Sequence, residues 1–258
     1  SDVYKRQVGI YDRLIITKIP EDEIRININL KFLPVNENNL IYKAYKLMKD
    51  EYRFSGGIDV DLNKFIPIAA GMAGGSTDAA STMFAINRLF ELGLSNEELM
   101  KQGVKIGADV PYCIMRGTAL AEGIGEKLTK LSPMPHCHIV VAKPPINVST
   151  KMVYESLDAG AITKHPDIDA IIEAINEGDV KKVAERMGNV LEDVTVPMYP
   201  VIAKIKNDMI SQGAYNAMMS GSGPTVFGIF PDEQTALKCK EYLKAQEDAR
   251  QVYITETF

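Results

Sequence analysis

Tryptophan is absent from this 258-residue sequence, and cysteine and histidine occur only three times each. The cysteines are Cys113, Cys137 and Cys239, and the histidines are His136, His138 and His165. No two cysteines form a Cys-x-x-Cys pair, so the sequence predicts neither a disulfide framework nor a zinc site, and it favours a reducing compartment. The histidines do not cluster with acidic residues at ligand spacing, so we expect no metal site built by the protein.

Long hydrophobic runs are missing as well. No apolar stretch approaches the ~18 residues of a membrane span, and residues 1–7 lack the hydrophobic segment of a secretory signal. The net charge of −5 argues against a nucleic-acid partner held by phosphate contacts. The 46% of hydrophobic and 24% of charged residues are typical of a folded globular protein. We therefore expect a cytoplasmic protein that has neither nucleic acid nor membrane as a partner.

Alternating and helical hydrophobic patterns predict a mixture of strands and helices. They place strands at residues 13–17, 24–30 and 58–62 and a helix that begins at Asn38 or Asn39. Ser95 and Glu98 form the capping-box pattern of a further helix. Later strands are expected at 138–143, 215–219, 225–230 and 251–257, and later helices at 167–176, 179–189, 201–212 and 232–246. This second half reads as α+β, and Pro144-Pro145 marks a boundary between two domains, 1–143 and 144–258.

The most informative segment is a loop of small residues that runs directly into a helical pattern. Gly71, Gly74 and Gly75 permit positive φ and remove Cβ atoms, so that backbone N–H groups can converge on a phosphate at a helix N-terminus. Ser76 and Thr77 add hydroxyl groups beside them. A tight strand-to-helix turn with Ser76 as its N-cap is the alternative. The loop is not a P-loop, which needs a lysine before Ser76, and it does not match the Gly-x-Gly-x-x-Gly dinucleotide fingerprint.

Four motifs follow one another along the chain. They are Pro67-x-x-x-Gly71-Met72-x-Gly74-Gly75-Ser76-Thr77-Asp78-Ala79-Ala80, Ile106-Gly107-Ala108-Asp109-Val110-Pro111, Val148-Ser149-Thr150-x-x-Val153-Tyr154 and Met219-Ser220-Gly221-Ser222-Gly223-Pro224-Thr225-Val226-Phe227. Together they resemble the GHMP kinases (galacto-, homoserine, mevalonate and phosphomevalonate kinases), and the resemblance extends from Val8 to Phe258. The motifs are most similar to the branch of the family that uses 4-diphosphocytidyl-2-C-methyl-D-erythritol in non-mevalonate isoprenoid biosynthesis.

The resemblance implies a fold of mixed α/β and α+β class, with an N-terminal ribosomal-protein-like domain that binds ATP and a C-terminal ferredoxin-like domain. It also implies transfer of the γ-phosphoryl group of ATP to the 2-hydroxyl of this small molecule, whose cytidine diphosphate group is bound. Magnesium is expected to arrive with ATP, with no protein ligand assigned. The alternatives are a GHMP kinase acting on homoserine or phosphomevalonate, a non-catalytic nucleotide-binding relative, and a purely structural domain.

Asp109 matches the family's catalytic aspartate, which must lie within ~3 Å of the acceptor hydroxyl to act as a base or positioning carboxylate. A helix-capping or turn aspartate beside Pro111 is its alternative role. The resemblance implies ATP binding by Pro67, Ile68, Ala69, Ala70, Gly71, Met72, Ala73, Gly74, Gly75, Ser76 and Thr77, and by Asn39 and Lys64 near the adenine. It implies substrate binding by Thr150 and Tyr154, and closure over the phosphates by Ser220, Gly221, Ser222 and Gly223. Without the family, Asn39 and Lys64 are interpreted as solvated surface residues and Tyr154 as a half-buried helix residue. The second glycine loop is then a hairpin turn.

The family's opening motifs, Pro-Ala-Lys-x-Asn-Leu and Gly-Tyr-His, do not occur in this sequence. The lysine of the first motif lies near the γ-phosphate and the aspartate, and Lys5 is not equated with it because residues 1–7 resemble nothing in the family. A shortened sequence with foreign leading residues is favoured over a chain that lacks these groups. We therefore expect severely impaired phosphoryl transfer and an exposed sheet edge.

Overall fold

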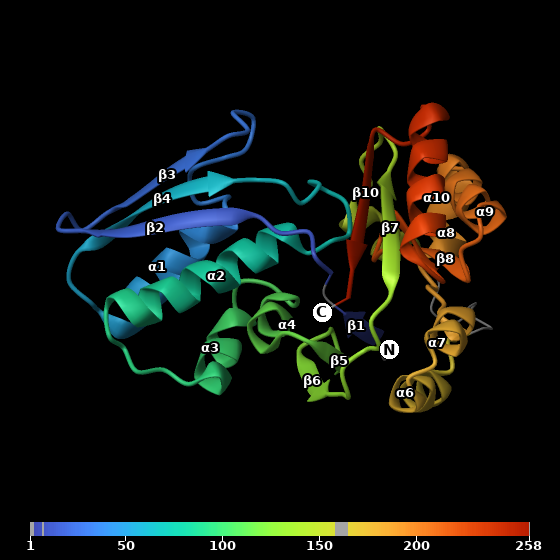
Figure 1. Cartoon of the computed structure of the whole chain (residues 1–258). Coiled ribbons are helices and arrows are strands. Elements are labelled where there is room, and N and C mark those ends of the chain that lie inside the picture. The colour runs from blue at the N-terminus through green and yellow to red at the C-terminus, as the bar shows by residue number, and fades with distance from the viewer. Residues whose placement is uncertain (1–2, 7, 158–164, 258) are drawn as a thin grey trace. The chain divides into compact units, whose positions relative to one another are not determined.

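The computed structural model describes residues 3–6, 8–157 and 165–257 (Figure 1). The chain divides into two compact units, and each is described by itself. The first unit comprises Ser1–Lys5, Ile10–Ile66 and Ala73–Lys130, and the second comprises Arg6–Gly9, Pro67–Met72 and Leu131–Phe258. Two short segments, 6–9 and 67–72, therefore belong to the second unit although their neighbours along the chain belong mostly to the first.

The frame of the first unit is a three-stranded sheet in the order β2-β4-β3. Its elements are β2 (Arg13–Ile19), β3 (Ile24–Ile28), α1 (Leu40–Tyr52), β4 (Gly57–Asn63) and α2 (Gly74–Leu89). β2 runs antiparallel to β4, and β3 runs parallel to it. Ile58, Val60 and Leu62 alternate along β4 and are buried, because α1 and α2 cover one face of the sheet (Figure 1). All three predicted strands are confirmed.

A second small sheet of the first unit has the order β1-β5-β6. The remaining elements are β1 (Val3–Arg6), α3 (Asn96–Gly103), α4 (Val110–Met115), β5 (Thr118–Glu122) and β6 (Lys127–Lys130). The sequence analysis did not predict these three strands, because each is only four or five residues long. The capping box of α3 is confirmed: the Ser95 side chain accepts from the Glu98 amide, and the Glu98 carboxylate accepts from the Ser95 amide.

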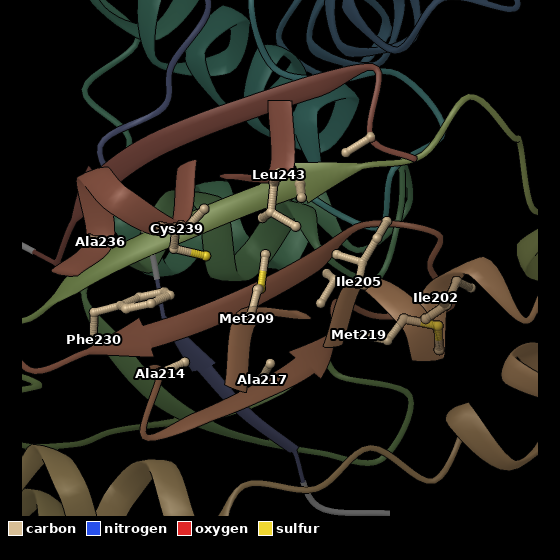
Figure 2. Close-up of a cluster of buried hydrophobic side chains, with 14 of the residues drawn as sticks. Ile202, Ile205, Met209, Ala214, Ala217, Met219, Phe230, Ala236, Cys239 and Leu243 are labelled. Carbon is tan, nitrogen blue, oxygen red and sulfur yellow. The ribbon is translucent and has the colours of Figure 1, made fainter. Parts of the chain in front are cut away.

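The second unit is built on a four-stranded antiparallel sheet in the order β10-β7-β9-β8. Its elements are β7 (His138–Lys143), α5 (Thr150–Ser156), α6 (Ile168–Glu177), α7 (Val180–Arg186), α8 (Glu192–Met198), α9 (Val201–Ser211), β8 (Asn216–Met219), β9 (Val226–Phe230), α10 (Glu233–Ala245) and β10 (Gln251–Glu256). Met209 of α9 and Leu243 of α10 are buried in one cluster with Phe230 of β9 (Figure 2). The predicted α+β class is confirmed here.

The position of β7 bears on the domain division. The sequence analysis places residues 138–143 at the end of the first domain, before Pro144-Pro145. In the structure β7 pairs with β9 and β10, and the compact units divide between Lys130 and Leu131. The boundary after residue 143 stays a prediction about domains, but the hydrogen bonds of β7 lie within the second unit.

Candidate active site

Asp109 stands immediately before α4 with its side chain free of any capping bond to that helix. Pro111 occupies the first turn of α4, where proline fits because the amide it lacks would have no partner within the helix. The Asp109 carboxylate is 48% exposed and lies 2.6 Å from the ammonium of Lys5. Asp109 occupies the N-cap position of α4 but makes no side-chain capping bond, so the helix-capping alternative is wrong for its side chain. The alternative of a turn aspartate stays open, and the carboxylate is accessible.

Lys5 lies on β1, and its side chain is only 17% exposed. Its Nζ also lies 5.7 Å from the centroid of the Tyr112 ring. Gly125 makes room for it, since a Cβ atom at that position would come within 3.0 Å of Nζ. The sequence analysis does not equate Lys5 with the family's lysine, and that stays a prediction. The structure nevertheless places the Lys5 ammonium beside Asp109.

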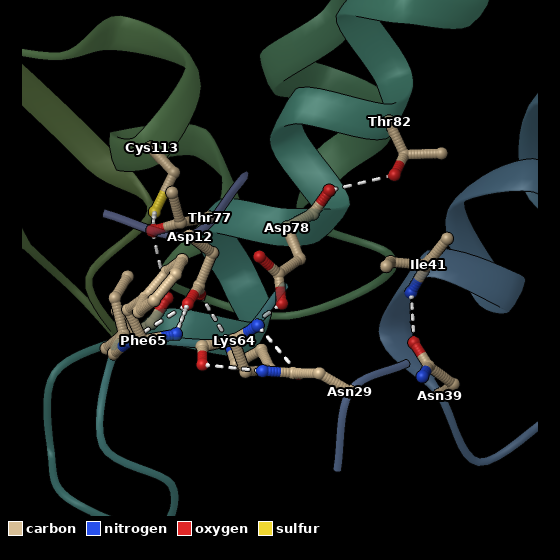
Figure 3. A network of polar contacts seen from close by, with 12 residues as sticks. Asp12, Asn29, Asn39, Ile41, Lys64, Phe65, Thr77, Asp78, Thr82 and Cys113 are labelled. Atoms are coloured by element: carbon tan, nitrogen blue, oxygen red, sulfur yellow. Dashed lines mark hydrogen bonds and ion pairs between the residues drawn. The ribbon is translucent and has the colours of Figure 1, made fainter. Parts of the chain in front are cut away.

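Thr77, in the first turn of α2, faces α4. Its hydroxyl donates to the carbonyl of Ala73 at 3.0 Å and lies 3.4 Å from the sulfur of Cys113 (Figure 3). Cys113 is four residues beyond Asp109, whose carbonyl accepts from its amide. Burial raises the pKa of the Cys113 thiol to about 11, so it is uncharged near neutral pH and is not a nucleophile.

The glycine-rich loop has a left-handed backbone at Ala69, Gly71 and Ala73, with φ of 50°, 70° and 52°. Two of these residues are alanine, for which the conformation costs roughly 1 kcal/mol or more each. α2 begins at Gly74, and its N-cap Ala73 has no side-chain capping bond. The alternative with Ser76 as N-cap is therefore wrong, because Ser76 is already inside the helix. The first amides of α2 have neither an intrahelical partner nor a capping side chain.

The second unit brings the two glycine motifs together. The Ser220 hydroxyl donates to the carbonyl oxygen of Gly71 at 2.9 Å. A Cβ atom at Gly71 would lie 2.1 Å from the carbonyl oxygen of Ser220, so only glycine fits this approach. Asn189 holds the second loop by donating to the carbonyls of Met219 and Gly221, each at 2.8 Å. The second glycine loop thus contacts the predicted phosphate loop directly.

The predicted substrate-side residues lie on α5. Thr150 is its first residue, and its hydroxyl is 2.8 Å from the hydroxyl of Ser222. Tyr154 is one turn further along the same helix and is 60% exposed. Thr150 is therefore joined to the second glycine loop, and Tyr154 presents an accessible aromatic side chain.

Comparison with known proteins agrees with these motifs. The model of the GHMP kinase N-terminal domain matches residues 39–117, and that of the GHMP kinase C-terminal domain matches residues 165–249. A 4-diphosphocytidyl-2-C-methyl-D-erythritol kinase of Lachnospira eligens is 69% identical over 251 residues, which cover 97% of this chain and 87% of that protein. The chain belongs to the GHMP kinase family.

Further relatives extend the comparison. A Clostridium novyi protein with the same name as the L. eligens kinase is 47% identical over 99% of this chain and 90% of its own length. A crystal structure of 4-(cytidine 5'-diphospho)-2C-methyl-D-erythritol kinase aligns with a TM-score of 0.84 at 27% identity, covering 100% of this chain and 90% of that one. Homoserine kinase from Cytophaga hutchinsonii aligns with a TM-score of 0.84 at 18% identity, over 98% and 89% of the two chains, and shares the fold.

Two residues predicted to lie near the adenine of this GHMP kinase have structural roles. Asn39 caps α1: its side chain accepts from the Ile41 amide at 2.8 Å and donates to the Pro34 carbonyl at 2.7 Å. Lys64 is neither solvated nor available, because its ammonium is buried between the carboxylates of Asp12 and Asp78 (Figure 3). This placement argues against an adenine contact through the ammonium of Lys64.

Sequence reasoning missed three charged residues of the kinase: Lys5, Asp12 and Asp78. Asp78 lies inside the glycine-rich motif, and its acidic side chain there was the signal that could have indicated a charged partner for Lys64. In the described part of the chain, no group of three or more His, Cys, Asp or Glu residues is arranged to hold a metal ion. No helix among these residues is long and apolar enough to cross a membrane.

Proposed function

We propose that this chain is an ATP-dependent kinase that phosphorylates the 2-hydroxyl of 4-diphosphocytidyl-2-C-methyl-D-erythritol. The observation that carries the proposal is the 69% identity, over 97% of the chain, to a protein of that name. The likenesses to homoserine and mevalonate kinases, at 18% and 16% identity, extend to the fold alone. They therefore do not favour a different acceptor.

In the proposed reaction Asp109 receives or orients the proton of the acceptor hydroxyl. Its carboxylate is accessible and is held by one strong partner, which is the arrangement that a positioned base needs. The Lys5 ammonium next to it provides positive charge where negative charge develops on the transferred phosphoryl group. Cys113 takes no part, because its buried thiol remains protonated.

The phosphates of ATP are assigned to the glycine-rich loop and the first turn of α2. An anion suits a helix N-terminus whose amides have no side-chain cap, and α2 begins in this way after a loop with three left-handed residues. The described residues provide no cluster of three metal ligands. Magnesium would enter with the nucleotide, and no protein ligand is assigned to it. Thr150 and Tyr154 are assigned to the cytidine end of the substrate, where an exposed ring can stack on a base.

The test is a coupled assay of the full chain with ATP and 4-diphosphocytidyl-2-C-methyl-D-erythritol, run beside homoserine and phosphomevalonate. We expect turnover with the cytidine diphosphate substrate alone, and the size of kcat tests the prediction of severely impaired transfer. Asp109→Asn is expected to lower kcat at least ~100-fold, the usual contribution of a positioned base, while ATP binding is retained. Phosphorylation of homoserine in preference to the cytidine diphosphate substrate, or an Asp109→Asn variant as active as the wild type, would contradict the proposal.

A further inference from the structure

Three charged side chains form a buried cluster in the first unit (Figure 3). Asp12 precedes β2, Lys64 follows β4, and Asp78 lies in the second turn of α2. Their side chains are only 1%, 5% and 6% exposed. The Lys64 ammonium pairs with Asp12 and lies 2.8 Å from Asp78. None of the three is required by the reaction described above.

The cluster holds in place the segment that immediately precedes the glycine-rich loop. Asp12 Oδ1 accepts from the amides of Phe65 at 2.6 Å and Ile66 at 2.9 Å, the last two residues before the loop. The Asn29 side chain accepts from the Lys64 amide at 3.0 Å and donates to its carbonyl at 3.3 Å. Residues 64–66 are therefore held by side-chain hydrogen bonds at three amides.

The same cluster also holds the segment that follows the loop, where α2 begins. Lys64 reaches across to Asp78 of α2. A Cβ atom at Gly74 would lie 2.9 Å from Cγ2 of Ile66 and 3.1 Å from Nζ of Lys64. The first residue of α2 thus lies directly against the residues that precede the loop. We call residues 64–66 and 74–78 the two stems of the loop, and the cluster joins them.

The charges of the cluster do not balance when all three groups are ionised. Two carboxylates share one ammonium away from solvent, and Asp78 Oδ1 has no hydrogen-bond partner among the described residues. Burial raises the pKa of Asp78 to about 7; the Lys64 ammonium opposes this shift, and the Asp12 carboxylate adds to it. Asp78 also influences the Cys113 thiol, which is uncharged at this pH. One added proton makes the cluster neutral.

We propose that Asp12, Lys64 and Asp78 form a positioning network that sets the distance between the two stems of the glycine-rich loop and binds one proton, on Asp78, when the loop takes up ATP. This inference rests on the proposed function. Loss of the proton leaves a net negative charge between the two stems of a loop that is proposed to bind a polyphosphate. In a buried, weakly screened place that charge weakens nucleotide binding.

The first experiment measures the Kd for ATP by calorimetry from about pH 5.5 to about pH 8.5, across the titration range of Asp78. Wild type, Asp78→Asn and the control Asp61→Asn are compared; Asp61 is an exposed carboxylate on β4, outside the cluster. We expect the Kd of the wild type and of Asp61→Asn to rise roughly three- to tenfold more than that of Asp78→Asn. The nucleotide's own titration affects all three proteins alike.

The second experiment tests the stems without ATP, by hydrogen exchange at the amides of Phe65 and Ile66. Asp12→Ala removes their acceptor and is expected to speed exchange at least ~10-fold, whereas Asp12→Asn keeps an acceptor oxygen and is expected to preserve protection. If Asp12→Ala does not fold, the comparison of Asp12→Asn with wild type still reports the contribution of the charge. Because Asp12→Asn removes one negative charge from the cluster, we expect KM for ATP above about pH 7 to fall, with little change in kcat.

The possible results distinguish the proposed function from the role of the proton on Asp78 and from the positioning of the two stems. Absence of ATP binding or phosphoryl transfer by the wild type overturns the proposed function, whatever the amides do. ATP binding whose pH dependence is the same in wild type and Asp78→Asn overturns the role of the proton. Unchanged exchange at both amides in a folded Asp12→Ala variant overturns the role of the network in positioning the stems.

Discussion

The hydroxyl of Ser220 donates a hydrogen bond to the carbonyl oxygen of Gly71 at 2.9 Å, although 149 positions separate the two residues in the sequence. The two motifs richest in glycine therefore support each other. The approach is close because neither Gly71 nor Gly221 carries a side chain at the contact. The loop that contains Ser220 thus supports the conformation of the glycine-rich loop at Gly71, and the glycine-rich loop is proposed to bind phosphate.

Gly71→Ala is expected to destabilise the protein and weaken ATP binding. Gly93→Ala is the matched control, because both glycines have φ of 70° but nothing lies within 4 Å of a Cβ at Gly93. Both variants bear the cost of a left-handed alanine, and only Gly71→Ala meets a carbonyl oxygen at 2.1 Å. We expect Gly71→Ala to lose about 1–3 kcal/mol more than Gly93→Ala in urea unfolding. Equal losses would show that the contact with Ser220 is not tight.

Lys5→Met is expected to lower kcat about 100-fold, because it removes the cation beside Asp109 while keeping much of the aliphatic chain. Little stability should be lost, since Asp109 is half exposed and ion pairs of this kind contribute about 0–1 kcal/mol. Lys130→Met, at an exposed lysine of β6, is the control. Steady-state kinetics and thermal unfolding measure both effects. An unchanged kcat would remove Lys5 from the proposed mechanism.

The native protein is expected to resist thiol reagents. All three cysteines are buried, and burial raises the pKa of Cys113 to about 11 and that of Cys239 to about 12. The thiolate is the reactive form, so its fraction at Cys113 near pH 8 is only about 0.001. Titration with a chromogenic disulfide should detect almost no thiol before unfolding and three per chain in denaturant. Rapid reaction of one thiol in the native protein would contradict this environment.

Asp78→Asn is expected to change how stability depends on pH. Because the pKa of Asp78 is raised in the folded state, from the ordinary 3.8 to about 7, folding takes up a proton between these values. The wild type therefore loses stability as the pH rises from about 4 to about 7, by up to about 4 kcal/mol, and no more from this group above that range.

The asparagine variant has no such group and should lose less stability over the same interval. Urea unfolding at several pH values measures the difference, with Asp61→Asn as the control for a lost surface carboxylate. Parallel stability curves for wild type and Asp78→Asn would show that Asp78 is ionised in the folded protein throughout.

Local patterns were enough to predict most elements. Alternation along residues 24–30 and 58–62 reflects a sheet covered on one face, and Ser95 with Glu98 encodes a helix start within four residues. β1, β5 and β6 were not predicted, because four or five residues beside glycine turns carry too little periodicity.

The candidate site was predictable as far as its residues belong to motifs. Asp109 and the glycine-rich loop stood out by residue type and order, and their proposed roles stay predictions. The contact between Lys5 and Asp109 joins positions 104 residues apart, and no periodic pattern records such a pair. Lys64 was interpreted as a surface or adenine residue because burial of a lysine depends on two acids, Asp12 and Asp78, that only the fold brings to it.

The interleaving of the two compact units limits how the polypeptide can be divided. A fragment that starts at Leu131 would contain the four-stranded sheet but not residues 6–9 or 67–72, which belong to the same unit. It would leave Ser220 without the carbonyl of Gly71 and Thr257 without its bridge to Val8. Separate expression of the C-terminal half should therefore yield an incomplete folding unit. Complementation by the N-terminal half would have to supply residues 6–9 and residues 67–72 together.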